Sequence, residues 1–240
     1  MSVERVGGLA DDGLLLAEKF VTVQGEGPSI GQPAVFLRTS RCNLHCPGCD
    51  TPFTWDATRF DLRAESTHVG WRALARWVLD QAPELVVITG GEPLLQQRHL
   101  LDLVGHLIGE GRRIEFETNG TVIPAVELDR DGVRFNVSPK LAGFAAPRDA
   151  AIRINVPALA ALRDTGRAVF KFVVSHPDEL EQVAALADKH ALAPVWVMPE
   201  GTTERSVLDG MRALVDPARA LGFSVSPRLH ILLWGDDRGR

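Results

Sequence analysis

Residues 41–51 read RCNLHCPGCDT and contain all three cysteines of the 240-residue chain. Cys42, Cys46 and Cys49 follow one another with the spacing CxxxCxxC. An odd, tightly spaced set of cysteines is a poor disulfide framework, and in a reducing compartment it favours a soft-metal or iron–sulfur site. Because the chain has no fourth cysteine, a four-iron cluster bound here would keep one iron open for another ligand.

A second use of this loop stays open on the residues alone. Zinc sites usually combine two cysteine pairs, so here His45 would have to supply the fourth ligand. The alternative for His45 is an exposed histidine of the loop. A zinc or iron–sulfur module without enzymatic activity is therefore an alternative to a redox centre.

Outward from the cysteines, β-type apolar runs alternate with helical patterns. This alternation predicts a parallel sheet with right-handed crossovers, and about six units are too few for an eight-unit barrel. A partial barrel or an open doubly wound sheet remains. Ser175 and Asp178 provide a start signal for one helix, and residues 143–151 are expected to form a surface loop. The expected strands are 20–23, 34–37, 85–88, 114–117, 133–137, 168–174 and 195–197, and the expected helical faces cover 71–78, 101–108, 180–187 and 207–215.

Polar turns follow four of these strands. They comprise residues 89–93, 117–120, 138–140 and 198–201, and the cysteine loop also follows a strand. Because ligands bind at the carboxyl ends of parallel strands, we expect all five segments to meet at one rim.

Composition narrows the class of protein. The net charge is −5, and the 26 basic residues form no dense run, which gives no support to nucleic-acid or membrane-surface binding. No apolar stretch approaches the ~18 residues of a membrane span, and residues 1–13 lack the pattern of a secretory signal. We expect one cytoplasmic domain over residues 1–240, with a cluster loop at about 40–55 and a C-terminal extension from about 222.

The cysteine motif after a strand resembles the signature of radical S-adenosylmethionine enzymes. Further motifs, VQGEGP, TGGEP, ETNG, SPK and RLHILLWG, make residues 20–234 similar to the 7-carboxy-7-deazaguanine synthase family within that superfamily. The resemblance implies a partial (β/α)6 barrel of the radical SAM type. It also implies a 4Fe–4S cluster, S-adenosylmethionine and Mg²⁺ as cofactors.

The family pattern also implies roles for single residues. Cys42, Cys46 and Cys49 would hold the cluster, and Thr51 would donate its hydroxyl to Mg²⁺. Glu92 would help to hold the methionine amino group, with capping of a helix as its alternative. The residues expected to bind S-adenosylmethionine are Gly48, Cys49, Asp50, Gly91, Glu92, Ser138, Pro139 and Lys140.

Substrate positions follow from the same resemblance: Val23, Gln24, Gly25, Arg38, Thr89, Glu117 and His230. The Arg38 guanidinium suits a carboxylate, with a salt bridge at the rim as the alternative. Glu117 could accept hydrogen bonds from a pterin amino group, and Glu115, which shares its face of the strand, competes for that role. The alternative for His230 is a histidine of the core.

The implied reaction converts 6-carboxy-5,6,7,8-tetrahydropterin to 7-carboxy-7-deazaguanine and ammonia by radical ring contraction, in 7-deazapurine (queuosine-type) biosynthesis. A flavodoxin- or ferredoxin-type reductant would supply the electron. A homodimer is also expected, with Leu232, Leu233 and Trp234 available for an interface or for the core. The alternatives are a glycyl-radical-activating or other radical SAM enzyme, and a metal-binding module without activity.

Overall fold

A computed structural model describes residues 13–240 of the protein. Residues 1–12, to which the expectation about a secretory signal mainly refers, lie outside the described residues. The described chain builds one nine-stranded sheet in the order β3-β1-β2-β4-β5-β6-β7-β8-β9. The strands are β1 (Gly13–Val23), β2 (Pro33–Thr39), β3 (Thr67–Gly70), β4 (Leu85–Gly90), β5 (Arg113–Thr118), β6 (Val133–Val137), β7 (Ala168–Val174), β8 (Val195–Pro199) and β9 (Ser224–Val225).

The sheet curves into the expected partial barrel. Strands β2, β4, β5, β6, β7 and β8 pair in parallel, and β9 continues the parallel series. At the other edge, β1 pairs antiparallel with both β2 and β3. The sequence did not predict this antiparallel edge; it arises because the short segment between β1 and β2 forms a hairpin and is too short for a parallel crossover.

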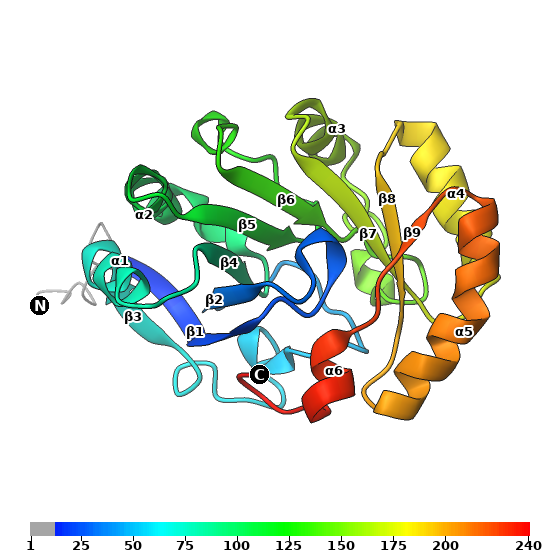
Figure 1. The fold of residues 1–240 in the computed structure, drawn as a ribbon, viewed down its shortest axis with the longest axis horizontal. Helices are drawn as coiled ribbons and strands as arrows, with labels where there is room; N and C mark the ends of the chain where they lie inside the picture. Colours follow the sequence, from blue (N-terminus) through cyan, green and yellow to red (C-terminus); the bar gives the residue numbers. More distant parts are fainter. Residues whose placement is uncertain (1–12) are drawn as a thin grey trace, which may run out of the picture.

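The helices are α1 (Trp71–Leu79), α2 (Gln97–Gly109), α3 (Val156–Asp164), α4 (Glu179–His190), α5 (Glu204–Ala220) and α6 (Leu229–Trp234). Helices α1 to α5 lie along the outer side of the curved sheet, whereas α6 and the C-terminus lie across its open side (Figure 1). The buried face of α2 is rotated from the expected one. Leu100 and Leu103 are buried, whereas Leu101, at the start of the expected face, is only half-buried. Helix α4 begins next to Asp178, where the start signal was expected, but the Asp178 side chain makes no capping hydrogen bond and the Ser175 N–H donates to the side chain of Glu179.

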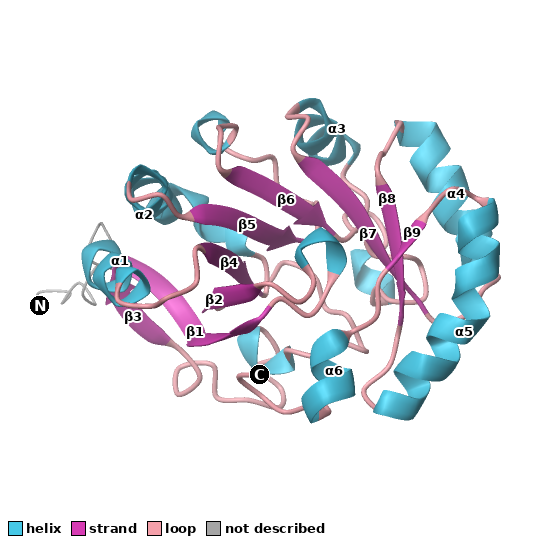
Figure 2. Ribbon diagram, viewed as in Figure 1, coloured by secondary structure: helices cyan, strands magenta, loops and turns pink. Residues whose placement is uncertain are grey.

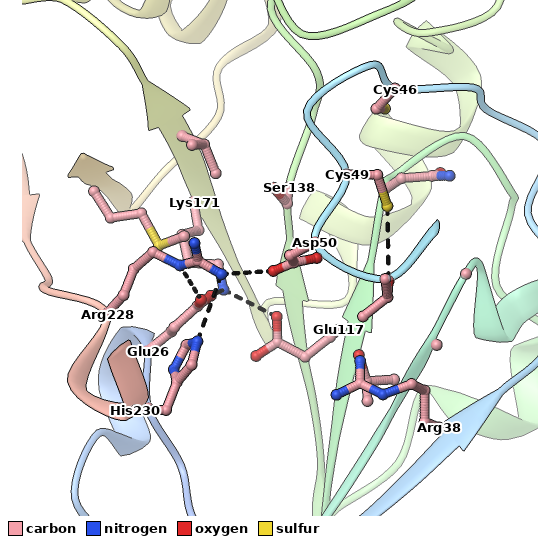
Figure 3. Close-up of a pocket in the computed structure, with 18 of the residues that line it drawn as sticks. Glu26, Arg38, Cys46, Cys49, Asp50, Glu117, Ser138, Lys171, Arg228 and His230 are labelled. Carbon is pink, nitrogen blue, oxygen red and sulfur yellow. Dashed lines mark hydrogen bonds and ion pairs between the residues drawn. The ribbon is translucent and has the colours of Figure 1, made fainter. Parts of the chain in front are cut away.

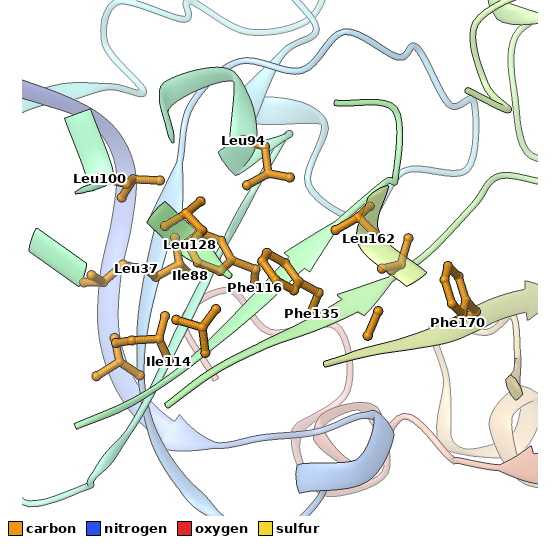
Figure 4. Packing of buried hydrophobic residues seen from close by; sticks show 14 of the residues in the cluster. Leu37, Ile88, Leu94, Leu100, Ile114, Phe116, Leu128, Phe135, Leu162 and Phe170 are labelled. Atoms are coloured by element: carbon orange, nitrogen blue, oxygen red, sulfur yellow. The ribbon is translucent and has the colours of Figure 1, made fainter. Parts of the chain in front are cut away.

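Alternation along the strands separates a core from a polar interior. In β5, β6 and β7 the large side chains of Phe116, Phe135 and Phe170 face the outer helices and are fully buried (Figure 4). Since side chains on a strand alternate between faces, Glu117 and Lys171 point to the inner side of the barrel. Loops that follow the strands meet at this inner side next to α6 (Figure 2).

Candidate active site

A cavity of about 260 Å³ opens at the carboxyl ends of the parallel strands, lined by the cysteine loop and by residues from all four polar turns. It therefore brings together the segments that the sequence placed at one rim. The expected site residues that line it are Val23, Gln24, Gly25, Arg38, Cys42, Cys46, Gly48, Cys49, Asp50, Thr51, Thr89, Gly91, Glu117, Ser138, Lys140 and His230. Pro139 and Glu92 are not among its lining residues.

The cysteine loop is fastened to the turn after β4. The N–H of Gly91 donates to the carbonyl of Thr39 at 3.1 Å, and the N–H of Glu92 donates to the carbonyl of Arg41 at 2.8 Å. Arg41 has φ of 80°, a left-handed conformation that is uncommon for a residue with a side chain. Strain of this kind persists only where the surroundings hold it, and here it directs the chain into the first cysteine.

The three thiols fit an iron–sulfur cluster by their chemistry. All three cysteines are free and line the cavity. Burial raises the pKa of Cys42 to about 12 and also raises the pKa of Cys46, so these thiolates need a positively charged partner, which a metal supplies. N–H groups of Leu44 and Asn119 point to the Cys42 sulfur at 3.5 and 3.8 Å, as donors do around metal-bound sulfur. Within residues 13–240 no group of three or more His, Cys, Asp or Glu side chains is placed to hold a single metal ion.

His45 neither lines the cavity nor projects freely from the loop. Its backbone N–H donates to Oδ2 of Asp149 at 2.6 Å, and its ring Nδ1 lies 3.1 Å from Oδ1 of the same carboxylate. The ring also packs edge-on against Trp55. Residues 143–151 are consequently more than the surface loop we expected, because they carry the buried Asp149 to the cluster loop.

The Glu92 side chain makes hydrogen bonds within and beside the turn and does not line the cavity. Its carboxylate is fully buried and accepts hydrogen bonds from the N–H of Leu94 at 3.0 Å, the hydroxyl of Thr118 at 2.8 Å and the N–H of Asn119 at 2.7 Å. The first contact caps a 3₁₀-helix at Pro93–Gln96. The direct cofactor contact expected of Glu92 is therefore unsupported, and the capping alternative describes it.

Glu92 predicts a pH dependence of stability. Burial raises its pKa from 4.5 to about 7, although its three hydrogen-bond donors act in the opposite direction. Because the folded state binds this proton more tightly, its stabilising contribution is complete below pH 4.5 and disappears as the pH rises through about 7. This group should lower the free energy of unfolding of the wild-type apoprotein by up to about 3 kcal/mol as the pH rises over this range. Because the side chain of Glu92→Gln cannot titrate, denaturant unfolding of that apoprotein should not show this fall. A fall of the same size in both proteins would mean that other groups cause it.

The residues expected to bind the sulfonium cofactor lie on the cysteine loop and at the end of β6. Gly48 and Asp50 line the cavity on the loop, and Ser138 and Lys140 line it beyond β6. The Lys140 ammonium donates to the Ser138 hydroxyl at 2.9 Å, and the three-donor ammonium group retains capacity for a carboxylate. Thr51 follows on the loop, with its hydroxyl oxygen 3.7 Å from the Cys49 sulfur.

The structure distinguishes the two carboxylates of β5. Glu117 lines the cavity, whereas Glu115 lies deeper and is 2% exposed. Glu115 accepts hydrogen bonds from Gln24 at 2.6 Å, Ser29 at 2.6 Å and Asn136 at 2.7 Å. Burial and the neighbouring Glu117 raise the pKa of Glu115. Of the two, only Glu117 can therefore meet a ligand in the cavity.

A chain of ion pairs that joins two buried cations to three carboxylates borders the cavity, and the sequence did not predict it (Figure 3). Lys171 bridges Glu26 and Glu117, at 2.5 and 2.9 Å. Arg228 bridges Glu26 at 3.3 Å and Asp50 at 2.6 Å, and so links these ion pairs to the cysteine loop. Burial alone would raise the pKa of Glu26, but Lys171 and Arg228 hold it well below its usual range. The available signal was Lys171 itself, a charged residue inside the apolar run AVFKFVV.

Arg38 and His230 both line the cavity, and each also contacts a neighbouring residue of the protein. The Arg38 guanidinium pairs with Glu18 at 2.8 Å, the rim salt bridge considered above, and still lines the cavity. Glu18 also pairs with Arg238. The ring of His230 packs against Gly25 so closely that a Cβ there would overlap it, and burial lowers its pKa, so the ring is neutral at pH 7. In the segment beyond α6, Arg240 also lines the cavity.

Comparisons with known proteins identify a superfamily, a family and a related fold. The Radical SAM superfamily model matches residues 36–140. The 7-carboxy-7-deazaguanine synthase of Pyrobaculum aerophilum is 35% identical over 93% of this chain and 96% of its own, and that of Hyperthermus butylicus is 36% identical over 92% of each. The crystal structure of QueE from Escherichia coli superposes with a TM-score of 0.69 at 24% identity, covering 89% of this chain and 93% of that one, which supports the fold.

Fold, cysteine loop and matched superfamily define an enzyme of the radical SAM class, with a 4Fe–4S cluster and S-adenosylmethionine as its cofactors. Within that class, the chain belongs to the 7-carboxy-7-deazaguanine synthase family. No helix within residues 13–240 has the length and apolar character needed to cross a membrane.

Proposed function

We propose that the protein converts 6-carboxy-5,6,7,8-tetrahydropterin to 7-carboxy-7-deazaguanine and ammonia, in 7-deazapurine biosynthesis. The observation that carries this proposal is the 35% identity to a 7-carboxy-7-deazaguanine synthase over nearly all of both chains. The gathering of the motif residues around one cavity supports it.

Cys42, Cys46 and Cys49 would hold the cluster, and Gly48, Asp50, Gly91, Ser138 and Lys140 would bind S-adenosylmethionine. When bound, these cofactors supply a 5′-deoxyadenosyl radical that can take a hydrogen atom from the substrate. The protein's own share is to orient the substrate and to exclude water and oxygen.

The substrate end of the cavity has the polarity that a carboxypterin requires. Glu117 offers carboxylate oxygens to N–H groups of the ring, and the Arg38 guanidinium offers N–H donors to a carboxylate. Val23, Gln24, Gly25, Thr89 and His230 would complete the substrate contacts. We also propose Thr51 as a hydroxyl ligand of Mg²⁺, with substrate oxygens and water as the other ligands.

A reductant must supply the electron, and we propose a flavodoxin- or ferredoxin-type protein in the cytoplasm, where the three thiols stay reduced. We further propose a homodimer that uses α6. Leu233 of this helix is 54% exposed, and Leu232 and Trp234 beside it are half-buried.

Turnover by the isolated protein tests this function. After anaerobic reconstitution with iron and sulfide, we expect 7-carboxy-7-deazaguanine to form from the pterin in the presence of S-adenosylmethionine and a reductant. Cys46→Ala should lower product formation at least a hundredfold, because the cluster loses a ligand. Chromatography with mass detection measures the product. Formation of 5′-deoxyadenosine without the product would indicate a radical SAM enzyme with another substrate, and formation of neither would reject the proposal.

A further inference from the structure

Lys171 is a buried lysine on the inner face of β7. Its side chain is 2% exposed, and its neighbours Phe170 and Phe172 lie in the core on the opposite face. The ammonium donates to Oε2 of Glu26 at 2.5 Å and to Oε2 of Glu117 at 2.9 Å. A charge at this depth is tolerated only when paired, so the ammonium and the two carboxylates form one unit.

Glu117 is held through both of its oxygens. Oε1 accepts N–H groups from Gln24 at 3.1 Å and from Asn136 at 3.2 Å, and Oε2 accepts the ammonium of Lys171. The side chain retains 17% exposure, toward the cavity that it lines. The carboxylate plane is thus fixed, while part of its acceptor capacity stays open to a ligand.

The two carboxylates depend on Lys171 to different degrees. Glu26 has a second cation, since Arg228 pairs with it at 3.3 Å. Within residues 13–240, Lys171 is the cation that pairs with Glu117, and the uncharged Gln24 and Asn136 are its other partners. Removal of Lys171 therefore affects Glu117 more than Glu26. The nearby Glu115 increases this effect through like-charge repulsion.

We propose that Lys171 is a positioning residue for substrate recognition, whose ammonium group holds the Glu117 carboxylate in the orientation that accepts N–H groups of a 2-amino-4-oxo heterocycle. The inference rests on the proposed function, because it takes Glu117 as the group that meets the pterin ring. Burial would lower the pKa of Lys171, but Glu117 and Glu26 raise it above its usual range, so the ammonium stays charged. A permanent charge suits a residue that orients Glu117 without itself exchanging protons.

A double-mutant cycle on the reconstituted holoenzyme tests this role. Lys171→Met and Glu117→Gln should each raise KM for the pterin about 10- to 100-fold and lower kcat less than about threefold, because each removes binding rather than chemistry. The double variant should have a KM no higher than the worse single variant, since Lys171 acts through Glu117. Lys189→Met, at an exposed lysine of α4, is the matched control and should leave both constants unchanged.

Iron content and the melting temperature accompany each kinetic measurement. A KM for Lys171→Met within twofold of the wild type overturns the inference, as does a double variant whose KM is raised by the product of the two single effects. If Lys171→Met does not fold, the KM of the double variant is compared with that of Glu117→Gln instead. The double variant can be used because it leaves no unpaired charge at position 117. Inactivity of the wild type toward the pterin would reject the proposed function itself.

Discussion

Replacing Gly91 by alanine is expected to reduce cluster loading strongly. A Cβ at this position would overlap the carbonyl oxygen of Arg41 and lie 2.8 Å from Cβ of Cys42. Both atoms belong to the start of the cluster loop, and neither is the far end of a flexible side chain, so the loop itself would have to move. Forcing an extra carbon into such a site costs typically 1–3 kcal/mol, which corresponds to roughly a 5- to 150-fold loss of the loop conformation that binds iron. We expect the iron content after reconstitution to fall to about a fifth of the wild-type value or less.

Gly109→Ala is the matched control, because a Cβ at Gly109 meets nothing within 4 Å. Iron is measured before S-adenosylmethionine is added, so that a defect of cluster loading is separated from a defect of cofactor binding at the same glycine. Circular dichroism of both apoproteins establishes that the fold is retained. A Gly91→Ala protein with a full complement of iron would show that the loop adapts, contrary to the packing argument.

Replacing Asp149 by alanine is expected to make the cluster short-lived. The buried Asp149 carboxylate accepts the backbone N–H of His45, the residue directly before Cys46. Loss of the acceptor leaves a partly buried N–H without a partner at a cost of about 1–3 kcal/mol. We expect the cluster of Asp149→Ala to bleach about tenfold faster under a chelator, which the decay of its visible absorbance measures.

Two further variants separate the hydrogen bond from the charge and from the ring. Asp149→Asn retains an oxygen that can accept the His45 N–H, and His45→Ala retains that N–H while removing the ring. Both should bleach within about threefold of the wild-type rate. Equal decay in wild type and Asp149→Ala would exclude Asp149 as a support of the loop.

The sequence predicted where the cavity opens better than it predicted which carboxylate lines it. Strand periodicity placed Glu115 and Glu117 on one face, and the turn pattern placed the rim at the ends of the strands. Periodicity does not state how far along a strand the cavity extends, so the choice between them needed the structure. In the structure Gln24, Ser29 and Asn136 cover Glu115, and Glu117 remains at the opening.

Glu92 and Asp149 illustrate a second limit. A glutamate after two glycines in a ligand-binding turn looked like a cofactor contact, but its carboxylate turns inward to Leu94, Thr118 and Asn119. Asp149 lay in a segment that looked like an exposed loop, yet its main partner is 104 residues away. In both cases an N–H group far along the chain, that of Asn119 or of His45, helps to fix the direction of the carboxylate, and no local pattern records that partner.

The sequence by itself determined the three-thiol loop, the parallel strands with four of their helices, and the collection of polar turns at one rim. These follow from spacing and periodicity among residues that are near each other along the chain. Only the tertiary structure decided the charge chain of Glu26, Lys171 and Arg228, whose ion pairs join residues up to 202 positions apart. The physical reason is that the curved sheet removes these side chains from water together, and a buried charge requires a partner that only the closed fold supplies.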